Sequence, residues 1–501
     1  MAVNTHHPKF DEHLEDWVLL QDAYKGEAAI KAKGSTYLPP TSGMIMDGLA
    51  NENQLGYKAY QAYITRAVFP EFMTESVNTS MGMLWYKDPV IKLPSAMEPL
   101  LNRASVKGET LMQLYRRVHE QQLSTGRCGL LVDLPVNVPQ GTEILPYMAL
   151  YETTTIINWD DGQIGSPTLQ TLNLVVLDET EPVRDGFMWT TKSKYRVLSL
   201  GDMKDNETMG TYFAQVLTVE NGEDVEDLPV FSPVFRGKTL DEIPFVFINS
   251  KDLLPDPDVP PLISLARGCM AIYRGEADYR QNLFMQGQDT LVVIGSDQDD
   301  GKFRLGANAV LELPTGADAK YIGVNSKGLA EQRLSLENDR RLAASRSGQL
   351  VDTTSRQRES GDALQTRVAA QTATLNDIAR TAAGGLERAL KIIAKWMGAN
   401  PDEVSVKPNL DFVNIQLTSR NIVELQTAKN LGAPISQETI HAIMAQRQLT
   451  TKTFEEEVAA IGKEKILVDD KILNPGGGEN NGGQTNPEGD QNGSGRGAAG
   501  V

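Results

Sequence analysis

The spacing of apolar residues changes along the chain, and the changes divide it into regions of different predicted structure. In the N-terminal quarter the apolar residues recur at helical spacing. Tyr57, Tyr60 and Ile64 form one such series, and Leu111 and Leu114 begin another. Residues three and four apart lie on one face of a helix. We therefore predict mainly helices and loops before residue 125.

Between residues 127 and 250 the apolar residues gather in short runs. These runs are rich in β-branched and aromatic side chains and are bounded by Gly, Pro, Asp and Asn, which is typical of strands. The runs are Cys128–Asp133, Tyr147–Trp159, Leu169–Leu177, Tyr195–Leu200, Tyr212–Val219 and Phe245–Asn249. The pattern predicts a mostly antiparallel sheet, so the first 250 residues are expected to form one α+β domain.

A proline-rich break follows at Leu254–Pro261, where four of the last seven residues are proline. Proline is tolerated in the first turn of a helix. We therefore expect a long helix over 261–288. A small β-rich insert comes next, with strands expected at 291–295, 310–313 and 320–324.

A second helix is predicted over 328–350. Its apolar residues recur at seven-residue steps, which are typical of helices that pack along their length. They are Leu329, Leu336, Ala343 and Leu350.

The C-terminal part begins with a polar loop between Gly348 and Gly361. A long helix is predicted over 361–398, with a kink at Gly384–Gly385, and a strand over 410–417. Residues 419–467 are expected to be helical. The last 28 residues contain ten Gly and five Asn, so they cannot form a core and are expected to be a disordered tail.

Charge and length narrow the class of protein. The 501 residues carry a net charge of −18. A protein that grips nucleic acid through phosphate contacts needs a basic face, so nucleic acid is either no partner or one that is not held tightly. The polar segment Met1–Phe10 predicts no signal peptide, and no apolar run approaches the ~20 residues of a membrane span. We expect a chain made in the cytosol.

Signals for catalysis are weak. The sequence contains no P-loop, dinucleotide-binding, zinc-protease or nucleophile-elbow motif. Cys128 and Cys269 are expected to be buried free thiols, and the five histidines form no metal-ligand pattern. Asp297–Gly301 fails the spacing of a calcium loop. We predict no enzyme activity, no metal and no cofactor.

Arginine is concentrated between residues 331 and 358. This segment holds six arginines, four acids and no lysine. Glu337 and Arg341 form a favourable helical pair. Two interpretations remain open: a salt-bridged helix surface, or contact between a loop and an anion such as DNA phosphate.

The order of elements resembles that of the portal proteins of tailed bacteriophages, the head-to-tail connector family. The order is an α+β domain, a proline-rich break, a helix, a β insert, a return helix, a polar loop, a long helix, a strand, a helical segment and a tail. Further segments resemble a portal subfamily often described as a family of unknown function. They are His7–Pro8, Trp17, Gly26–Ala28, Tyr37–Pro39, Tyr60–Ala67, Gly126–Asp133, Ile156–Trp159 and Ser360–Leu364.

The resemblance implies a portal fold divided into named parts. These are a wing (1–255), stem helices (256–290 and 328–350), a clip (291–327), a tunnel loop (351–360), a long kinked wing helix with a wing strand (361–418), a helical crown (419–473) and the disordered tail (474–501). It also implies tentative sites. Thr353, Thr354, Ser355, Arg356 and Arg358 would face a DNA channel. Asp297, Asp299, Asp300, Lys302 and Arg304 would dock the packaging motor and adaptors, and Leu329, Leu336, Ala343 and Leu350 would form the stem interface.

The implied function is a ring, commonly a dodecamer, at one capsid vertex, through which double-stranded DNA is packaged and ejected. Implied partners are the terminase large subunit, head-completion and adaptor proteins, and the major capsid and scaffolding proteins, with no membrane. The chain would reside in the virion after assembly in the host cytoplasm. Twelve copies at −18 each would carry −216, a wall that repels DNA.

Two alternatives stay open. Another virion structural or adaptor protein is one, although adaptors are shorter and a capsid protein would not explain the helix–β–helix insert. An α+β enzyme is the other, but it needs a pocket with convergent titratable groups that the sequence does not indicate.

Overall fold

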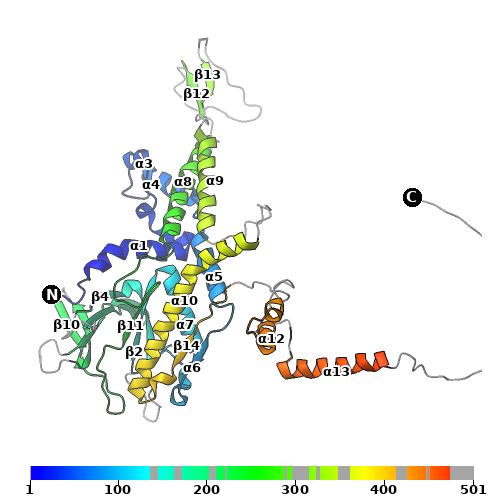
Figure 1. Ribbon diagram of the computed structural model, residues 1–501. Helices are drawn as coiled ribbons and strands as arrows, with labels where there is room; N and C mark the ends of the chain where they lie inside the picture. The colour runs from blue at the N-terminus through cyan, green and yellow to red at the C-terminus, as the bar shows by residue number, and fades with distance from the viewer. Residues whose placement is uncertain are drawn as a thin grey trace, which may run out of the picture. The chain divides into compact units, whose positions relative to one another are not determined.

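The computed structural model divides the chain into two compact units, Met1–Val413 and Asn414–Val501. It describes residues 2–135, 145–162, 172–201, 210–220, 223–286, 290–295, 315–316, 318–322, 328–347, 361–412, 426–446, 450 and 452–473. Among them, no helix is long and apolar enough to cross a membrane. Helix and strand are mixed throughout the first unit, which makes it an α+β structure (Figure 1).

The N-terminal residues form helices, as their spacing predicts. These helices are α1 (Pro8–Lys25), α2 (Glu27–Ala32), α3 (Ser42–Met46), α4 (Leu55–Arg66), α5 (Phe72–Leu84), α6 (Pro99–Asn102) and α7 (Leu111–Ser124). Local sequence fixes where α7 begins. The Thr110 side chain accepts a hydrogen bond from the Gln113 backbone, and the Gln113 side chain accepts one from the Thr110 backbone. This capping box satisfies two backbone donors that a helix start leaves unpaired.

Two antiparallel sheets follow. One has the order β11 (Phe245–Asn249), β2 (Arg127–Asp133), β3 (Tyr147–Glu152); the other has the order β10 (Glu223–Phe231), β9 (Tyr212–Glu220), β8 (Tyr195–Leu200), β5 (Leu174–Asp178), β4 (Ile156–Asp160). Each of the six predicted runs contains strand. The run at 147–159 is two strands, because a turn of 3-10 helix at Thr153–Thr155 separates β3 from β4. The sequence did not predict β10.

A long hairpin and a short sheet also escaped prediction. The hairpin pairs β6 (Glu181–Asp185) with β7 (Met188–Lys192) and follows directly from the paired strands β5 and β8. The short sheet pairs β1 (Val90–Lys92) with β14 (Ser405–Lys407). The strand expected at 410–417 is wrong in its first part, because residues 410–412 are not in a strand and β14 lies earlier. Residues 413–417 lie outside the described residues.

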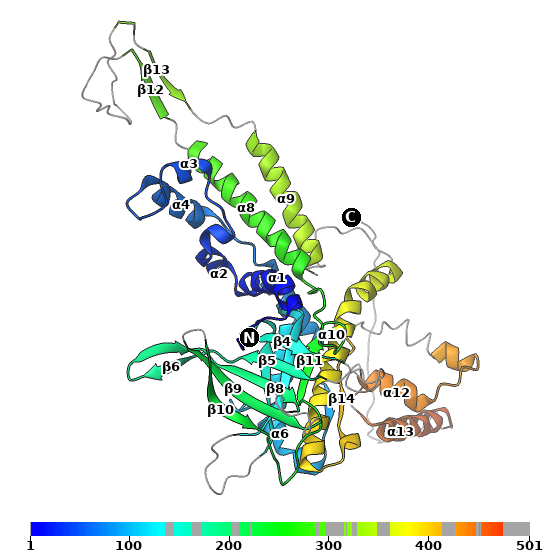
Figure 2. The same cartoon turned by 90° about the vertical axis from the view of Figure 1, so that its left-hand side faces the viewer.

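The helix–β–helix insert has the predicted order. Helix α8 (Ile263–Gln286) leads to strand β12 (Thr290–Ile294), which pairs with β13 (Asp318–Ile322) before α9 (Leu329–Arg346) returns. Helices α8 and α9 lie side by side, and the β12–β13 hairpin lies beyond their ends (Figures 1 and 2). The strand expected at 310–313 lies outside the described residues.

Helix α10 (Gly361–Met397) connects the two hydrophobic cores of the first unit. Its C-terminal half packs on β11 and β2, and Leu375, Ile378 and Ala379 belong to the core around α4, α5 and α8. The helix is continuous across Gly384–Gly385. A Cβ atom at 385 would lie 2.5 Å from Cγ1 of Ile248, so glycine is needed there for close packing.

The second unit contains α12 (Gln437–Gln446) and α13 (Phe454–Leu473), in agreement with the helical pattern of its sequence. His441 and Ile440 are buried within it, and the His441 ring packs edge-on against Phe454. The glycine-rich tail 474–501 lies outside the described residues.

Candidate functional site

The predicted stem stripe lies on α9, where the structure buries part of it within a single chain. Leu336 and Ala343 are buried and Leu329 is half-buried, whereas Leu350 lies outside the described residues. Leu336 packs on Gly275 of α8, where an added Cβ atom would lie 2.9 Å from the Leu336 Cδ2 atom. A role for Leu336 and Ala343 between subunits stays a prediction, but their first contact is with α8 of their own chain.

A buried carboxylate anchors the same helix pair. Glu276 of α8 is 4% exposed. It accepts a hydrogen bond of 2.6 Å from the Arg280 Nε atom, and Arg340 of α9 donates to its other oxygen. A carboxylate removed from water needs such partners, because an unpaired buried charge is costly. The sequence analysis missed Glu276. The spacing of Glu276 and Arg280, four residues apart on a helix, was the available signal.

A cavity of about 400 Å³ lies between α8 and α9. Charged side chains of both signs line it together with Tyr279, Leu283 and Leu336: Glu276, Arg280, Arg333, Glu337 and Arg340. The predicted Glu337–Arg341 pair is present at 3.9 Å with both side chains largely exposed. In this part of the chain the arginines are therefore divided between a buried ion pair and an open helix surface.

The remaining predicted sites cannot be located in the same way. The channel residues Thr353, Thr354, Ser355, Arg356 and Arg358 lie outside the described residues. So do the docking residues Asp297, Asp299, Asp300, Lys302 and Arg304. Both sets stay predictions.

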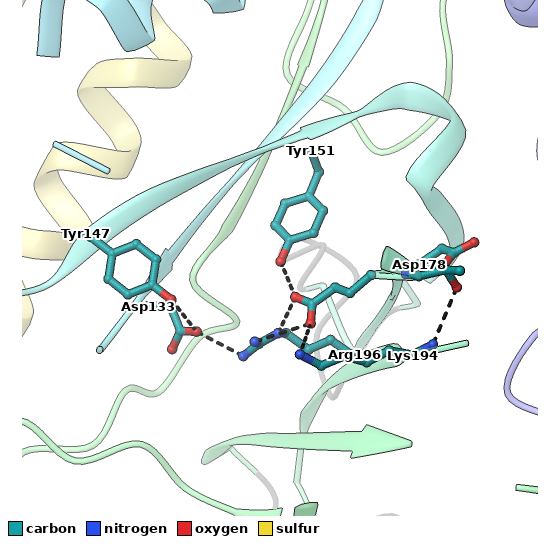
Figure 3. A network of polar contacts seen from close by, with 8 residues as sticks. Asp133, Tyr147, Tyr151, Asp178, Lys194 and Arg196 are labelled. Carbon is teal, nitrogen blue, oxygen red and sulfur yellow. Dashed lines mark hydrogen bonds and ion pairs between the residues drawn. The ribbon is translucent and has the colours of Figure 1, made fainter. Parts of the chain in front are cut away.

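A second cluster of charges joins the two sheets of the first unit (Figure 3). Arg196 of β8 lies between two carboxylates, with its Nη1 atom 2.9 Å from Asp133 and its Nε atom 2.7 Å from Glu179. The Tyr151 hydroxyl donates a hydrogen bond of 2.5 Å to Glu179, and the Tyr147 hydroxyl lies 3.3 Å from Asp133. Asp133 and the tyrosines belong to the β2–β3 sheet, so the network ties that sheet to β8.

The pKa directions in this cluster follow from its burial and its pairing. Burial raises the pKa of Asp133 and outweighs the attraction of Arg196. Burial also acts to raise the pKa of Glu179, but Arg196 and the hydrogen bonds from Arg196 and Tyr151 hold that pKa below its usual range. Each carboxylate thus has a cation or a hydroxyl donor, and the cluster is arranged to hold the sheets together.

The described side chains that could act as nucleophiles or metal ligands include two cysteines and a histidine, which are buried apart from one another. Cys128 and Cys269 are free and buried, as predicted, and burial raises their thiol pKa values to about 12 and about 11. His119 is buried against Tyr115 and Trp85, and burial lowers its pKa to about 4. Within the described ranges, no group of three or more His, Cys, Asp or Glu side chains is placed to hold a metal ion.

Comparisons with known proteins give one family and a set of similar solved structures. Residues 261–397, from the start of α8 to the end of α10, match a family described as a domain of unknown function, DUF4055. No curated protein matches the chain. The N-terminal segments that resemble a portal subfamily lie outside the matched residues.

Two of the similar solved structures are necks of particles. One is the neck of a native GTA particle computed with C12 symmetry, at 14% identity and a TM-score of 0.38, covering 74% of this chain and 89% of that one. The other is the neck of an empty GTA particle computed with C6 symmetry, at 14% identity and a TM-score of 0.35, covering 84% and 98%. At these scores the likeness decides neither the fold nor the function of this chain.

Proposed function

We propose that this chain is the subunit of a portal ring, the DNA channel at one vertex of a phage-type capsid. The observation that carries the proposal is the helix pair α8–α9 with the β12–β13 hairpin beyond its ends. Of the 18 residues of α9, all of them described, only Leu336 and Ala343 are buried. A long helix that its own chain covers so little is typical of a helix that packs against other subunits.

Exposed apolar side chains on the same helices support assembly. Leu334 and Leu342 of α9 are about half exposed, and so are Leu283, Phe284 and Met285 near the end of α8. Single exposed leucines are ordinary, but several along one projecting pair of helices indicate a contact surface. Neighbouring copies in a ring would cover them.

The charge of the chain supports a conduit for DNA. A net charge of −18 makes tight binding of a polyanion unfavourable, while DNA must pass through a channel without being held. In this proposal Arg356 and Arg358 of the tunnel loop make weak, salt-dependent contacts with phosphate. The charged residues at 297–304 dock the terminase and later the adaptors. The ring sits at the capsid vertex of the virion.

Negative-stain microscopy of the purified full-length protein tests the proposal. We expect rings with a central hole, and Leu334→Asp in α9 should shift the population toward single chains. Val106→Asp replaces an equally exposed residue between α6 and α7 and serves as the matched control. A wild-type protein that stays monomeric at every concentration would contradict the portal proposal.

A further inference from the structure

The β6–β7 hairpin is an arm that leaves the wing. Its strands pair from Glu181↔Lys192 to Asp185↔Met188, and all ten strand residues are exposed. The turn between them is Gly186–Phe187, with Gly186 at a φ of +59°. The paired strands β5 and β8 hold the base of the arm. Two strands beyond the rest of a sheet are marginally stable in water, so a surface that covers the tip would stabilise it.

The end of the arm is apolar on both faces. Phe187 is 99% exposed, and Met188 and Trp189 are each about two-thirds exposed or more. Successive side chains of a strand point to opposite faces, so Met188 and Trp189 face in opposite directions. A flat partner surface would cover one of them and leave the other in water. A concave partner surface would cover both Met188 and Trp189, with Phe187 at the deepest point of the cavity.

A hollow of suitable size lies at the opposite end of the same strand pair. It is a cavity of about 170 Å³ whose lining combines eight apolar residues with three charged ones. Its lining comprises Asp161, Leu172, Leu200, Glu242, Ile243, Phe245, Phe247, Leu253, Leu254, Pro255 and Arg388. An apolar cavity of about 150 Å³ holds a benzene molecule. The phenyl ring of Phe187 is of that size.

The arm cannot enter the cavity of its own chain. It leaves the sheet at Asp178 and Tyr195, whereas the cavity lies at Leu172 and Leu200. About five residues of strand separate these ends, or roughly 16 Å, and the arm extends away from them. In Figure 2 the β6 strand projects on one side of the sheets, and α10 lies on the other. An arm that enters this cavity would therefore have to belong to another molecule.

Charge matches the arm to a second copy of this chain. The cavity carries Asp161 and the exposed cation Arg388, while its third charge, Glu242, is paired with Lys395 at 3.2 Å. The arm carries Arg184 and Asp185 directly beside its apolar tip. Opposite charges on each side would meet when Phe187 enters, which fixes the orientation of the contact.

We propose that the β6–β7 arm of one subunit inserts Phe187 into this cavity of the next. The two surfaces are different parts of one chain, so the contact is head-to-tail and can repeat around a closed ring. This inference rests on the proposed function in assuming that the chain forms a ring. It adds the surface through which neighbouring wings bind one another.

Substitution at the tip tests the contact. Phe187→Asp should raise the protein concentration needed for half-assembly roughly tenfold or more, because the buried aromatic ring is replaced by a charge. Sedimentation velocity measures the assembly. Val234→Asp, at an exposed apolar residue after β10, is the matched control and should have little effect. Equal effects of the two variants would overturn the proposal.

Cross-linking between two different chains locates the contact. Phe187→Cys and Leu254→Cys are made in separate chains and mixed under assembly conditions with a short bis-maleimide. The native thiols of Cys128 and Cys269 are buried, so they should not react. We expect a cross-linked dimer in the mixture and none in either variant alone. A dimer of Phe187→Cys alone would mean that two tips meet, and would overturn insertion into the cavity.

Failure of this inference can be separated from failure of the portal proposal. Rings in the microscope without the mixed cross-link, and unaffected by Phe187→Asp, would overturn the arm contact and leave the portal proposal standing. A wild-type chain that forms no oligomer would overturn both.

Discussion

Helices α9 and α10 follow one another along the chain, yet their own chain buries them very differently. In α10 the side chains of Leu386, Leu390, Ile393 and Trp396 are at most 1% exposed. In α9 two of 18 residues are buried, and the exposed residues include four arginines and two leucines. Helix α10 is therefore a core element. Helix α9 lies on the surface and is attached to α8 by one line of contacts.

From this difference we expect α10 to contribute mainly to the stability of the single chain and α9 mainly to assembly. Because α10 packs on both hydrophobic cores, folding of one chain is enough to fix it. Helix α9 depends on Leu336, Ala343 and the Glu276–Arg340 pair, so its other faces are left for neighbouring subunits. Changes in α10 should therefore unfold single chains, and changes in α9 should act locally and on assembly.

The largest effect is expected in α10. Trp396→Ala removes a fully buried ring and the hydrogen bond of 3.1 Å from its Nε1 atom to the Lys238 carbonyl. We expect the free energy of unfolding to fall by about 3–5 kcal/mol. Urea unfolding of dilute protein measures it. Leu342→Ala in α9 is the control and should change stability by less than about 0.5 kcal/mol. Similar losses in both variants would remove the contrast between the helices.

A pH titration of stability should show how completely the packing around α10 excludes water from His119. His119 of α7 lies near Ala379 of α10 at a site packed too tightly to hold water, and it has a pKa of about 4 in the folded chain. The unfolded chain binds this proton near pH 6.5, so the free energy of unfolding should fall as pH drops from about 6.5 to 4. The loss from this group is about 3 kcal/mol.

His119→Gln isolates that contribution. The variant should lose less stability than the wild-type protein over the same pH interval, because the carboxylates titrate in both. Parallel curves from pH 7 to 4 would show that the His119 ring is protonated in the folded chain.

Next in size is a charge placed in the line of contacts between α8 and α9. Leu336→Asp should release α9 from α8 at a local cost of about 2–3 kcal/mol, because the carboxylate would be buried against Gly275. Hydrogen exchange should quicken in α9 and stay slow in the C-terminal half of α10. Rings should also fall to small oligomers. Intact rings with unchanged exchange in α9 would disprove the placement of this helix.

The smallest effect is expected at the ion pair. Arg340→Ala leaves Glu276 with Arg280, and Arg340 is itself about half exposed, so the loss should be about 1 kcal/mol. Arg341→Ala removes the exposed 3.9 Å pair and should cost less than about 0.5 kcal/mol. Thermal unfolding of the two variants compares them. A larger loss for Arg341→Ala would show that the surface pair is the one that holds α9.

Local pattern was sufficient for much of the fold. The sequence predicted the long helix that the structure shows as α10, and the apolar runs predicted the strands of both sheets except β10. These predictions succeeded because a buried face repeats with the period of its own element. The proline-rich break likewise located the beginning of α8 to within two residues.

Elements without a buried apolar face could not be predicted from the sequence pattern. Strand β10 is acidic, and the exposed β6–β7 hairpin has no alternation of apolar and polar residues to mark it. Strand β14 is three residues long and exists through its pairing with β1, more than 300 residues earlier. Pairing partners of that kind are set by the fold and not by neighbouring residues.

The ion pairs around Glu276 and around Arg196 likewise depend partly on the sequence and partly on the tertiary structure. The sequence determined that arginines are concentrated in α9 and that Glu276 and Arg280 lie on one helix face. Only the tertiary structure decided that Glu276 is buried and that Arg340 reaches it, or that Arg196 lies between Asp133 and Glu179. The free energy of a charge depends on what surrounds it, and those surroundings come from segments far away in the sequence.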